Sequence, residues 1–264
     1  MECVPVKLRA GACFSSWRGD RRDVETQSAT CVLCGSKEHK ILYALRDYEH
    51  GVPGRWTVGQ CRECGLCFHV PLPSPSEIAG FYPRSYSAYS NDSPINWMFS
   101  VVYWLDARRV ARLVGTGGRI LDVGCGNGAA LLALRERGDW DLWGLEFDSD
   151  AVAAARRTDL RVIRGDLLSA DLPAGSFDLI RMGHVIEHVV DPLATLRRVF
   201  SLLKPGGYLI GETPNSACWD FKLLGRYWGG WHAPRHIIIF SRDNLKPAMV
   251  KAGFGEIALS PRLR

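Results

Sequence analysis

The sequence predicts an α/β fold with a doubly wound, mostly parallel sheet, preceded by a small cysteine-rich module. From residue 119 onward, short apolar runs alternate with helical patterns, which is typical of βαβ units. The first of these runs leads into a glycine-rich loop that opens a helix. Upstream, four cysteines form two Cys-x-x-Cys pairs. These three observations divide the chain into its parts.

The composition is that of an ordinary globular protein. Hydrophobic residues make up 47% and charged residues 23% of the 264 positions, which excludes a fibrous or largely disordered chain. The formal net charge of +5 is not gathered in runs of Lys and Arg, so it does not favour a nucleic-acid partner. Nine cysteines, an odd number, predict reduced thiols and a cytoplasmic protein. No apolar stretch has the length of a secretory signal or a transmembrane segment.

Four parts are expected along the chain. Residues 1–30 show no periodicity and predict a poorly ordered leader, whereas residues 31–70 carry the cysteine pairs on short strands. Residues 71–117 begin as a Pro-rich linker and end in a capping helix over about 96–114. Residues 118–264 form the α/β domain.

Periodicity places the elements of the α/β domain in order. We expect strands over 119–123, 142–147, 161–164, 177–182 and 208–212, and helices over 128–137, 149–157, 192–203 and 242–252. A last short strand is expected over 256–260. In such folds ligands bind at the carboxyl ends of the strands, and the motifs described next lie there.

A glycine loop follows the first predicted strand in the run ILDVGCGNG. Glycine lets backbone amides approach a ligand where a Cβ would clash. Gly124, Gly126 and Ala129 also satisfy the dinucleotide fingerprint, so NAD is an alternative ligand. Asp122 argues against NAD, because a carboxylate before the loop faces a pyrophosphate unfavourably but attracts an ammonium and a sulfonium. S-adenosylmethionine carries both cations.

Two further carboxylates follow the next two strands. Glu146, with Phe147 beside it, ends the second strand, where it can accept hydrogen bonds from ribose hydroxyls. Asp166, before Leu167, follows the third strand, where it can accept from an adenine amino group. Any one of these acidic residues could be a solvated helix cap. Three carboxylates after three successive strands, together with the glycine loop, predict a nucleoside site.

The runs ILDVGCGNG, GLEFD, GDLLSADLPAGSFDLI, HVIEHVVDP and LKPGGYLIGETPN resemble the successive motifs of class I S-adenosylmethionine-dependent methyltransferases. The resemblance covers about residues 118–260 and implies a Rossmann-like fold. Members of that family usually end in two strands after the last helix, whereas only 256–260 remains here. The resemblance implies a cofactor site formed by Asp122, Gly124, Gly126, Gly128, Glu146, Phe147, Asp166, Leu167 and His184.

The two cysteine pairs predict a metal site rather than a redox site. Each pair is followed by a glycine, Gly35 or Gly65, which can take a positive φ and aim amide hydrogens at the sulfurs. Four thiolates make a closed, zinc-ribbon-like structural site that does not catalyse a reaction. Cys67 is a spare that could replace Cys61 or Cys64. The expected zinc ligands are Cys31, Cys34, Cys61 and Cys64.

Two segments bear on the substrate. Residues 31–89, with the run FYPRSY, resemble the zinc-binding leader of some bacterial methyltransferases, several of which act on nucleotide-linked sugars. Residues 215–236 are rich in aromatics and glycine and are expected to form a substrate lid. The alternatives are a surface loop anchored by its aromatics, or contact with a membrane surface if the acceptor is lipid-linked.

Histidines are the candidate bases. Methyl transfer from a sulfonium needs in-line alignment, and it needs a base only if the acceptor must lose a proton. Glu187 and His188 follow the fourth strand, and His232 and His236 follow the fifth. Histidine suits proton removal near neutral pH, although a lone histidine is more often structural. His188 and His236 are the predicted bases.

The leading functional hypothesis is an S-adenosylmethionine-dependent methyltransferase acting on oxygen or carbon of a small molecule, such as a nucleotide-linked sugar. An RNA methyltransferase is the alternative enzyme, since zinc modules accompany some of those. A non-catalytic, cofactor-binding scaffold with the same fold is the alternative from another class. The sequence leaves the acceptor and the oligomeric state open.

Overall fold

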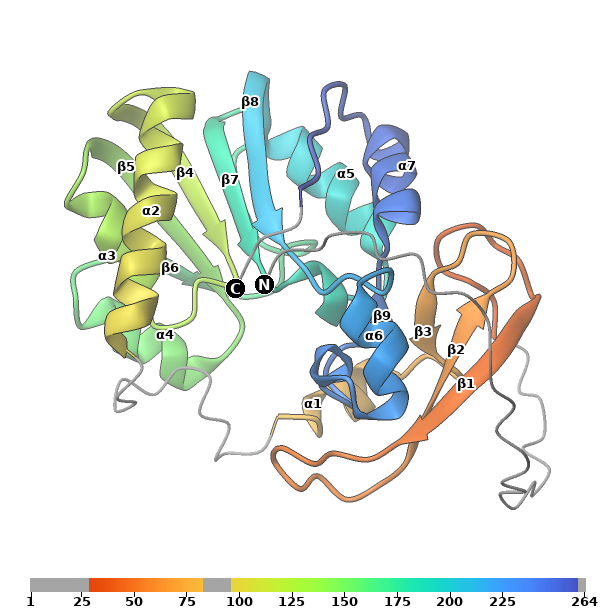
Figure 1. The fold of residues 1–264 in the computed structure, drawn as a ribbon. Helices are drawn as coiled ribbons and strands as arrows, with labels where there is room; N and C mark the ends of the chain where they lie inside the picture. The colour runs from red at the N-terminus through yellow and green to blue at the C-terminus, as the bar shows by residue number, and fades with distance from the viewer. Residues whose placement is uncertain (1–28, 83–95, 261–264) are drawn as a thin grey trace.

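The computed structural model describes residues 29–82 and 96–260. The chain forms two sheets, a five-stranded sheet and a four-stranded one that lies beside it (Figure 1). Most of the expected leader, together with residues 83–89 of the region that resembles a zinc-binding leader, lies outside the described residues. Within them, no helix is long and apolar enough to cross a membrane.

The five-stranded sheet is parallel throughout, as predicted. Its order is β6-β5-β4-β7-β8. Among these five strands β4 comes first in sequence but lies at the centre of the sheet. The carboxyl ends of all five strands therefore meet at one edge. The strands are β4 (Gly117–Val123), β5 (Asp139–Glu146), β6 (Arg161–Arg164), β7 (Phe177–Gly183) and β8 (Leu203–Glu212).

Helices cover both faces of this sheet, which confirms the doubly wound fold. Ile120 and Leu179 point to one face and pack with α2, α3 and α4, while Leu121 and Ile180 point to the other and pack with α5 and α7. This alternation is the period of two expected of strands. The helices are α2 (Asn96–Val114), α3 (Ala129–Arg135), α4 (Ser149–Arg156), α5 (Pro192–Leu202) and α7 (Arg242–Ala252).

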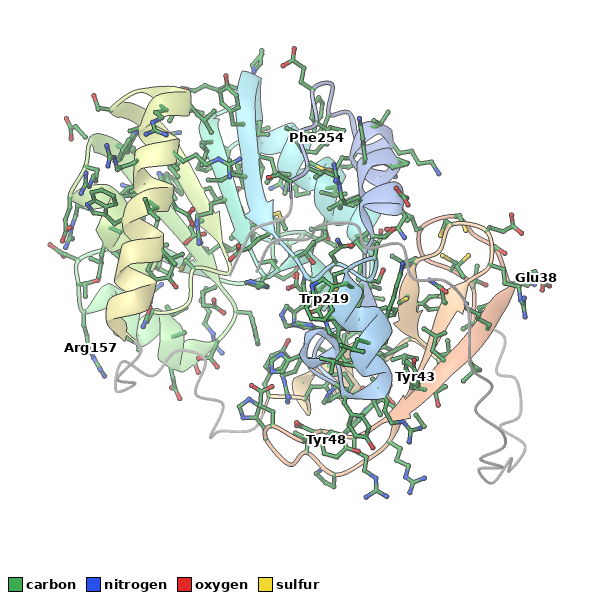
Figure 2. All side chains as sticks on the ribbon, in the orientation of Figure 1. Glu38, Tyr43, Tyr48, Arg157, Trp219 and Phe254 are labelled. Atoms are coloured by element: carbon green, nitrogen blue, oxygen red, sulfur yellow. The ribbon has the colours of Figure 1, made fainter. Side chains whose placement is uncertain are left out.

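The prediction of a strand over 256–260 is wrong. These residues form no regular secondary structure, and Glu256, Ala258 and Ser260 are exposed. A strand needs a hydrogen-bonding partner, and the described residues offer none at this position. Instead, Phe254, labelled in Figure 2, stacks on Phe200 of α5 with ring centroids 5.3 Å apart, so the chain runs over a helix.

The cysteine-rich module is an antiparallel sheet in the order β1-β2-β3-β9. β1 (His39–Leu45) pairs with β2 (Trp56–Cys61) as a hairpin around the loop 46–55. β3 (Cys67–His69) and β9 (Ile238–Ile239) were not predicted. β9 belongs to this sheet, although it follows β8 of the α/β domain in sequence. The domain boundary expected at residue 70 therefore stays a prediction.

The segment that brings the chain to β9 is tied to both sheets. The backbone amide of Ile237 donates to the carbonyl of Glu187 at 2.8 Å, and its carbonyl accepts from the amide of His69 at 3.0 Å. The residue before it is His236. The α/β domain and the module therefore meet next to one of the predicted bases.

The segment 215–236 is partly helical and is anchored by aromatic side chains. It contains α6 (Trp219–Leu224) and two 3₁₀ turns, Gly225–Tyr227 and Gly229–Trp231. Trp228 and Trp231 are buried in a small core against the module, where the ring of Trp231 contacts that of Tyr43. Trp219 and Tyr227 remain exposed. Its role as a lid stays a prediction.

The region 71–82, expected as a linker, holds one short helix. α1 (Pro75–Ala79) begins with a capping box, in which the amide of Glu77 donates to the hydroxyl of Ser74 and the Glu77 carboxylate accepts from the Ser74 amide. This pairing satisfies two backbone donors at the start of the helix. After it the chain reaches Tyr82, which lies against the α/β domain.

Candidate functional site

The loop between β4 and α3 needs glycine for its shape. Gly124 has φ +67°, and a Cβ there would lie 2.6 Å from Cγ2 of Val185. Gly128 has φ +82° and begins α3, and a Cβ there would collide with Leu160. Gly126 also has a positive φ. The loop thus exposes backbone at the start of a helix, where amide groups can meet a ligand.

Glu146 braces this loop from the end of β5. Its Oε2 accepts from the amide of Gly126 at 2.9 Å, and its Oε1 accepts from the amides of Phe147 and Asp148 at 2.8 and 3.0 Å. The side chain is almost fully buried. A carboxylate has about four acceptor positions, so roughly one remains for a ribose hydroxyl. Burial raises the pKa of Glu146, and the three amides oppose that rise.

Asp122 lies beneath the loop and pairs with the neighbouring strand. Its Oδ1 accepts from Nη1 of Arg181 at 3.0 Å, and its Oδ2 has no hydrogen-bond partner among the described residues. Asp106 of α2 lies 3.9 Å from the same guanidinium. Burial raises the pKa of Asp122, and Arg181 opposes that rise. Two carboxylates against one guanidinium give an excess of negative charge below the glycine loop, which favours a cationic ligand. Direct contact of Asp122 with the ligand stays a prediction.

The residues expected at the adenine and ribose end lie further out. Asp166 is exposed and its Oδ1 accepts from the Leu168 amide at 2.8 Å, while Leu167 is buried. Phe147 is 52% exposed, and its ring lies 5.3 Å from that of Tyr82. An exposed aromatic ring beside the glycine loop is free to lie against a flat ligand.

His184 is held as a cation. Its Nδ1 lies 2.9 Å from Glu187 and its Nε2 lies 3.2 Å from Glu212. Carboxylates accept hydrogen bonds, so both ring nitrogens carry protons. Burial alone would lower the pKa of His184, but the two hydrogen bonds outweigh it and raise the pKa to about 9. This histidine is therefore charged at neutral pH and is not a base.

His188 and His236 are held neutral. Nδ1 of His188 donates to the carbonyl of Arg235 at 3.0 Å, and Nδ1 of His236 donates to the carbonyl of Gly230 at 2.8 Å. A carbonyl only accepts, so each Nδ1 carries the proton and each Nε2 keeps its lone pair. Burial, helped by the neighbouring His236, lowers the pKa of His188 to about 4. Burial also lowers the pKa of His236, more than Glu187 raises it.

Glu187 lies between the three histidines and is fully buried. Its Oε1 is 3.9 Å from Nε2 of His236, and its Oε2 accepts no hydrogen bond from the described part of the chain. One atom each of Glu187, His188 and His236 lies within 4.8 Å of the others. Two neutral imidazoles and a carboxylate can share a proton, and such a donor set can also hold a divalent cation.

The four expected zinc ligands lie together in the module. The Sγ atoms of Cys31 and Cys64 are 3.6 Å apart, those of Cys34 and Cys61 are 3.5 Å apart, and all four lie within 4.8 Å of one another. A tetrahedral zinc ion with Zn–S bonds of about 2.3 Å separates its sulfurs by about 3.8 Å. The residues present therefore fit zinc. Cys67 is not part of this group but is buried in β3.

The comparison with known families decides where the chain belongs. A family described as a methyltransferase domain matches residues 103–258, which is more than half of the chain. The chain belongs to the methyltransferase domain family. The resemblance of the sequence to class I S-adenosylmethionine-dependent methyltransferases is thus confirmed.

Two curated relatives are similar to the methyltransferase domain of this chain. It is 39% identical over 121 residues to a ubiquinone biosynthesis O-methyltransferase of Xanthomonas campestris, covering 43% of this chain and 50% of that protein. A ubiquinone biosynthesis O-methyltransferase of Pseudomonas aeruginosa is 30% identical over 164 residues, covering 57% and 68%. The chain thus spans half the length of the Xanthomonas relative.

A solved structure supports the same fold. The S-adenosylmethionine-dependent methyltransferase of Archaeoglobus fulgidus superposes with a TM-score of 0.50 at 21% identity, over 61% of this chain and 75% of that one. At this identity the likeness concerns the fold alone. It agrees with the parallel sheet and flanking helices described above.

Several residues of this methyltransferase domain site were missed by the sequence. The hydroxyl of Tyr82 lies 3.0 Å from Nδ1 of His188, and Arg181, Glu212 and Arg235 contact predicted site residues. The sequence marks Tyr82 only as part of the run FYPRSY. Lone arginines have no spacing that would mark a site. The structure joins the predicted glycines to Glu146 and joins the three histidines around Glu187, and Tyr82 contacts both Phe147 and His188.

We expect Glu146→Gln to weaken binding of S-adenosylmethionine and its demethylated product about 10- to 100-fold. An amide NH₂ would face backbone donors, and hydrogen bonds to a charged group are worth about 1.5–3 kcal/mol. Isothermal titration calorimetry measures the affinity, with Asp148→Asn as control, because Asp148 caps α4 through its own carboxylate. Unchanged affinity in Glu146→Gln would show that this carboxylate does not serve the cofactor.

Proposed function

We propose that this protein transfers a methyl group from S-adenosylmethionine to an oxygen or carbon atom of a small molecule. The observation that carries the proposal is a pair of neutral histidines, the half-buried His188 and the buried His236, which keep unprotonated Nε2 atoms beside Glu187 at the carboxyl edge of the sheet. The Xanthomonas and Pseudomonas relatives are O-methyltransferases by name, which favours oxygen as the acceptor atom.

The cofactor would lie along the ends of β4, β5 and β6. The glycine loop would line the methionine part, with Asp122 organising the ammonium end from below. Glu146 would accept from the ribose, and Asp166 with the Leu167 amide would contact adenine. Phe147 and His184 would line the two ends of the same site. The excess of negative charge that Asp122 and Asp106 give below the loop supports a sulfonium ligand over a pyrophosphate.

The chemical step needs alignment and one proton acceptor. S-adenosylmethionine, when bound, would supply the methyl group, and the O–H proton of the acceptor would pass to Nε2 of a histidine. We assign this role to His188 or His236. Glu187, 3.9 Å from Nε2 of His236, would stabilise the imidazolium that forms. The cationic His184 beside it would hold Glu187 ionised.

The acceptor is proposed as a small molecule. A nucleotide-linked sugar is supported only by the resemblance of the N-terminal region. Trp219, Leu223 and Tyr227 are exposed on the segment 215–236, which supports a surface that meets the acceptor, or a membrane surface if the acceptor is lipid-linked. RNA receives no support from the dispersed charge.

Transfer can be tested directly with labelled S-adenosylmethionine. We expect label to enter a hydroxylated small molecule from a panel of phenols, sugars and nucleotide-linked sugars. Total RNA serves as the competing acceptor. Label in RNA alone would favour the RNA methyltransferase, and cofactor binding without label in any acceptor would favour the scaffold.

The base should be visible in turnover. Replacing the true base by alanine, in His188→Ala or His236→Ala, should lower kcat by on the order of 10²–10⁴-fold with cofactor affinity unchanged, since a general base acts on the chemical step. His39→Ala is the control, because His39 lies in β1 and stacks on Phe68. If both cluster variants turn over like the parent protein, neither histidine is the base.

We also propose that the four cysteines hold one structural zinc ion. Four thiolates leave no open position for water, so the ion would stabilise the module rather than catalyse. The site needs reduced thiols, which supports a cytoplasmic location. The Asn244 side chain donates to the carbonyl of Cys64 at 3.1 Å, which ties this corner of the module to α7.

Elemental analysis of the pure protein should find about one zinc per chain, because this spacing forms one closed site. Cys34→Ser should abolish it and lower the melting temperature. Cys218→Ser is the control, since Cys218 lies outside the group. A metal-free protein with an unchanged melting temperature would contradict the zinc site.

A further inference from the structure

An ion pair joins the module to the histidine cluster and is enclosed completely. Nη1 and Nη2 of Arg235 donate to the two carboxylate oxygens of Asp47 at 2.9 and 3.0 Å, and both side chains are 0% exposed. Asp47 belongs to the loop between β1 and β2, and Arg235 directly precedes His236. The two-pronged geometry fixes orientation as well as distance.

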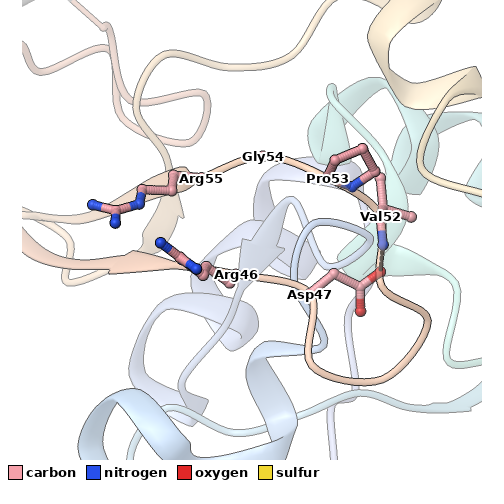
Figure 3. A pocket seen from close by; sticks show the side chains of 6 residues that line it. All are labelled: Arg46, Asp47, Val52, Pro53, Gly54 and Arg55. Atoms are coloured by element: carbon pink, nitrogen blue, oxygen red, sulfur yellow. Dashed lines mark hydrogen bonds between the residues drawn. The ribbon is translucent and has the colours of Figure 1, made fainter.

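The loop 46–55 is built around the Asp47 carboxylate. Oδ1 accepts from the amides of Glu49 and His50 at 3.0 and 2.9 Å. Oδ2 accepts from the amide of Val52 at 3.2 Å (Figure 3). Burial would raise the pKa of Asp47, but Arg235 and these amides hold it well below its usual range. The loop thus presents a fixed anion to Arg235.

Arg235 connects the loop 46–55 to the predicted bases. Its carbonyl accepts from Nδ1 of His188 at 3.0 Å, and its Nε donates to His232 at 3.2 Å. Its Nη1 also donates to the carbonyl of Phe81 at 3.2 Å. The next residue, Tyr82, contacts His188. One guanidinium therefore sets the backbone on both sides of the His188 ring.

Stability alone does not account for such a pair. A buried ion pair can often be replaced by apolar side chains of similar volume at no loss of stability, because desolvation offsets the attraction. Apolar side chains would not fix the direction of the Arg235 carbonyl. Nδ1 of His188 meets both the Arg235 carbonyl, which can only accept, and the Tyr82 hydroxyl, which can accept or donate. The tautomer of His188 therefore depends on the direction of the carbonyl, because the carbonyl is the partner that requires a proton on Nδ1.

We propose that Asp47 and Arg235 are positioning residues for methyl transfer, through which the N-terminal hairpin sets the orientation of His188 and His236. This inference rests on the proposed function, in which one of these histidines is the base. The module is then part of the active site rather than an attachment to it. The pair should affect the rate of the chemical step and leave cofactor binding alone.

Turnover tests the proposal first. Asp47→Asn keeps the size of the side chain and one acceptor oxygen, and we expect it to lower kcat on the order of 10- to 100-fold, as small misplacements of reacting groups do. Cofactor affinity should stay within about twofold, because only the chemical step is affected. Adding Asp47→Asn to the base variant should lower kcat no further, because its effect passes through that histidine. Additive losses would overturn the proposal.

The matched control is Asn244→Ala, which removes another contact between the module and the α/β domain, at Cys64. It should lower the melting temperature without lowering kcat. If Asn244→Ala lowers kcat as much as Asp47→Asn at an equal loss of melting temperature, the pair is merely structural and the proposal fails.

A readout without turnover separates this proposal from the proposed function. Imidazole ¹⁵N spectra of the whole protein should show His188 and His236 with the proton on Nδ1, and a mixture of tautomers for His188 in Asp47→Asn. An unchanged tautomer in the variant overturns the positioning role whether or not an acceptor is found. A shifted tautomer in a protein that transfers no methyl group upholds the positioning and rejects the proposed function.

Discussion

The central position of β4 in the parallel sheet is the constraint from which the site follows. Because β5 and β6 lie on one side of it and β7 and β8 on the other, the chain leaves β4 and β7 in opposite directions. In sheets of this kind ligands bind where the two directions part. The glycine loop, Glu146 and His184 lie at this edge of the sheet because each ends or follows one of its strands.

Histidines close together in this protein differ in charge because their partners differ. His184 meets two carboxylates and is held protonated, whereas His188 and His236 meet backbone carbonyls and are held neutral. The residue type is the same in each case. Which oxygen lies opposite a ring nitrogen is a property of the folded chain, so no sequence pattern could separate the candidate bases from the cation.

Local patterns were sufficient for most of the fold. The five parallel strands, the glycine loop and the two cysteine knuckles each lie within a few consecutive residues, and the structure has them where periodicity places them. β3 and β9 are too short to show a period, and their pairing joins distant residues. The alternating pattern over 256–260 could not reveal that no partner strand lies beside it. The ion pair of Asp47 and Arg235 joins two loops with no spacing rule between them.

The position of β9 restricts how this protein could be rearranged. Residues 238–239 complete the sheet of the module, yet in sequence they lie between His236 and α7. A module transplanted onto another enzyme of this fold would arrive with an unpaired edge at β3. The graft would need the recipient's own strand to match Cys67 and Phe68 in register. The N-terminal module and the stretch around β9 therefore have to be transferred together, although most of the chain separates them in sequence.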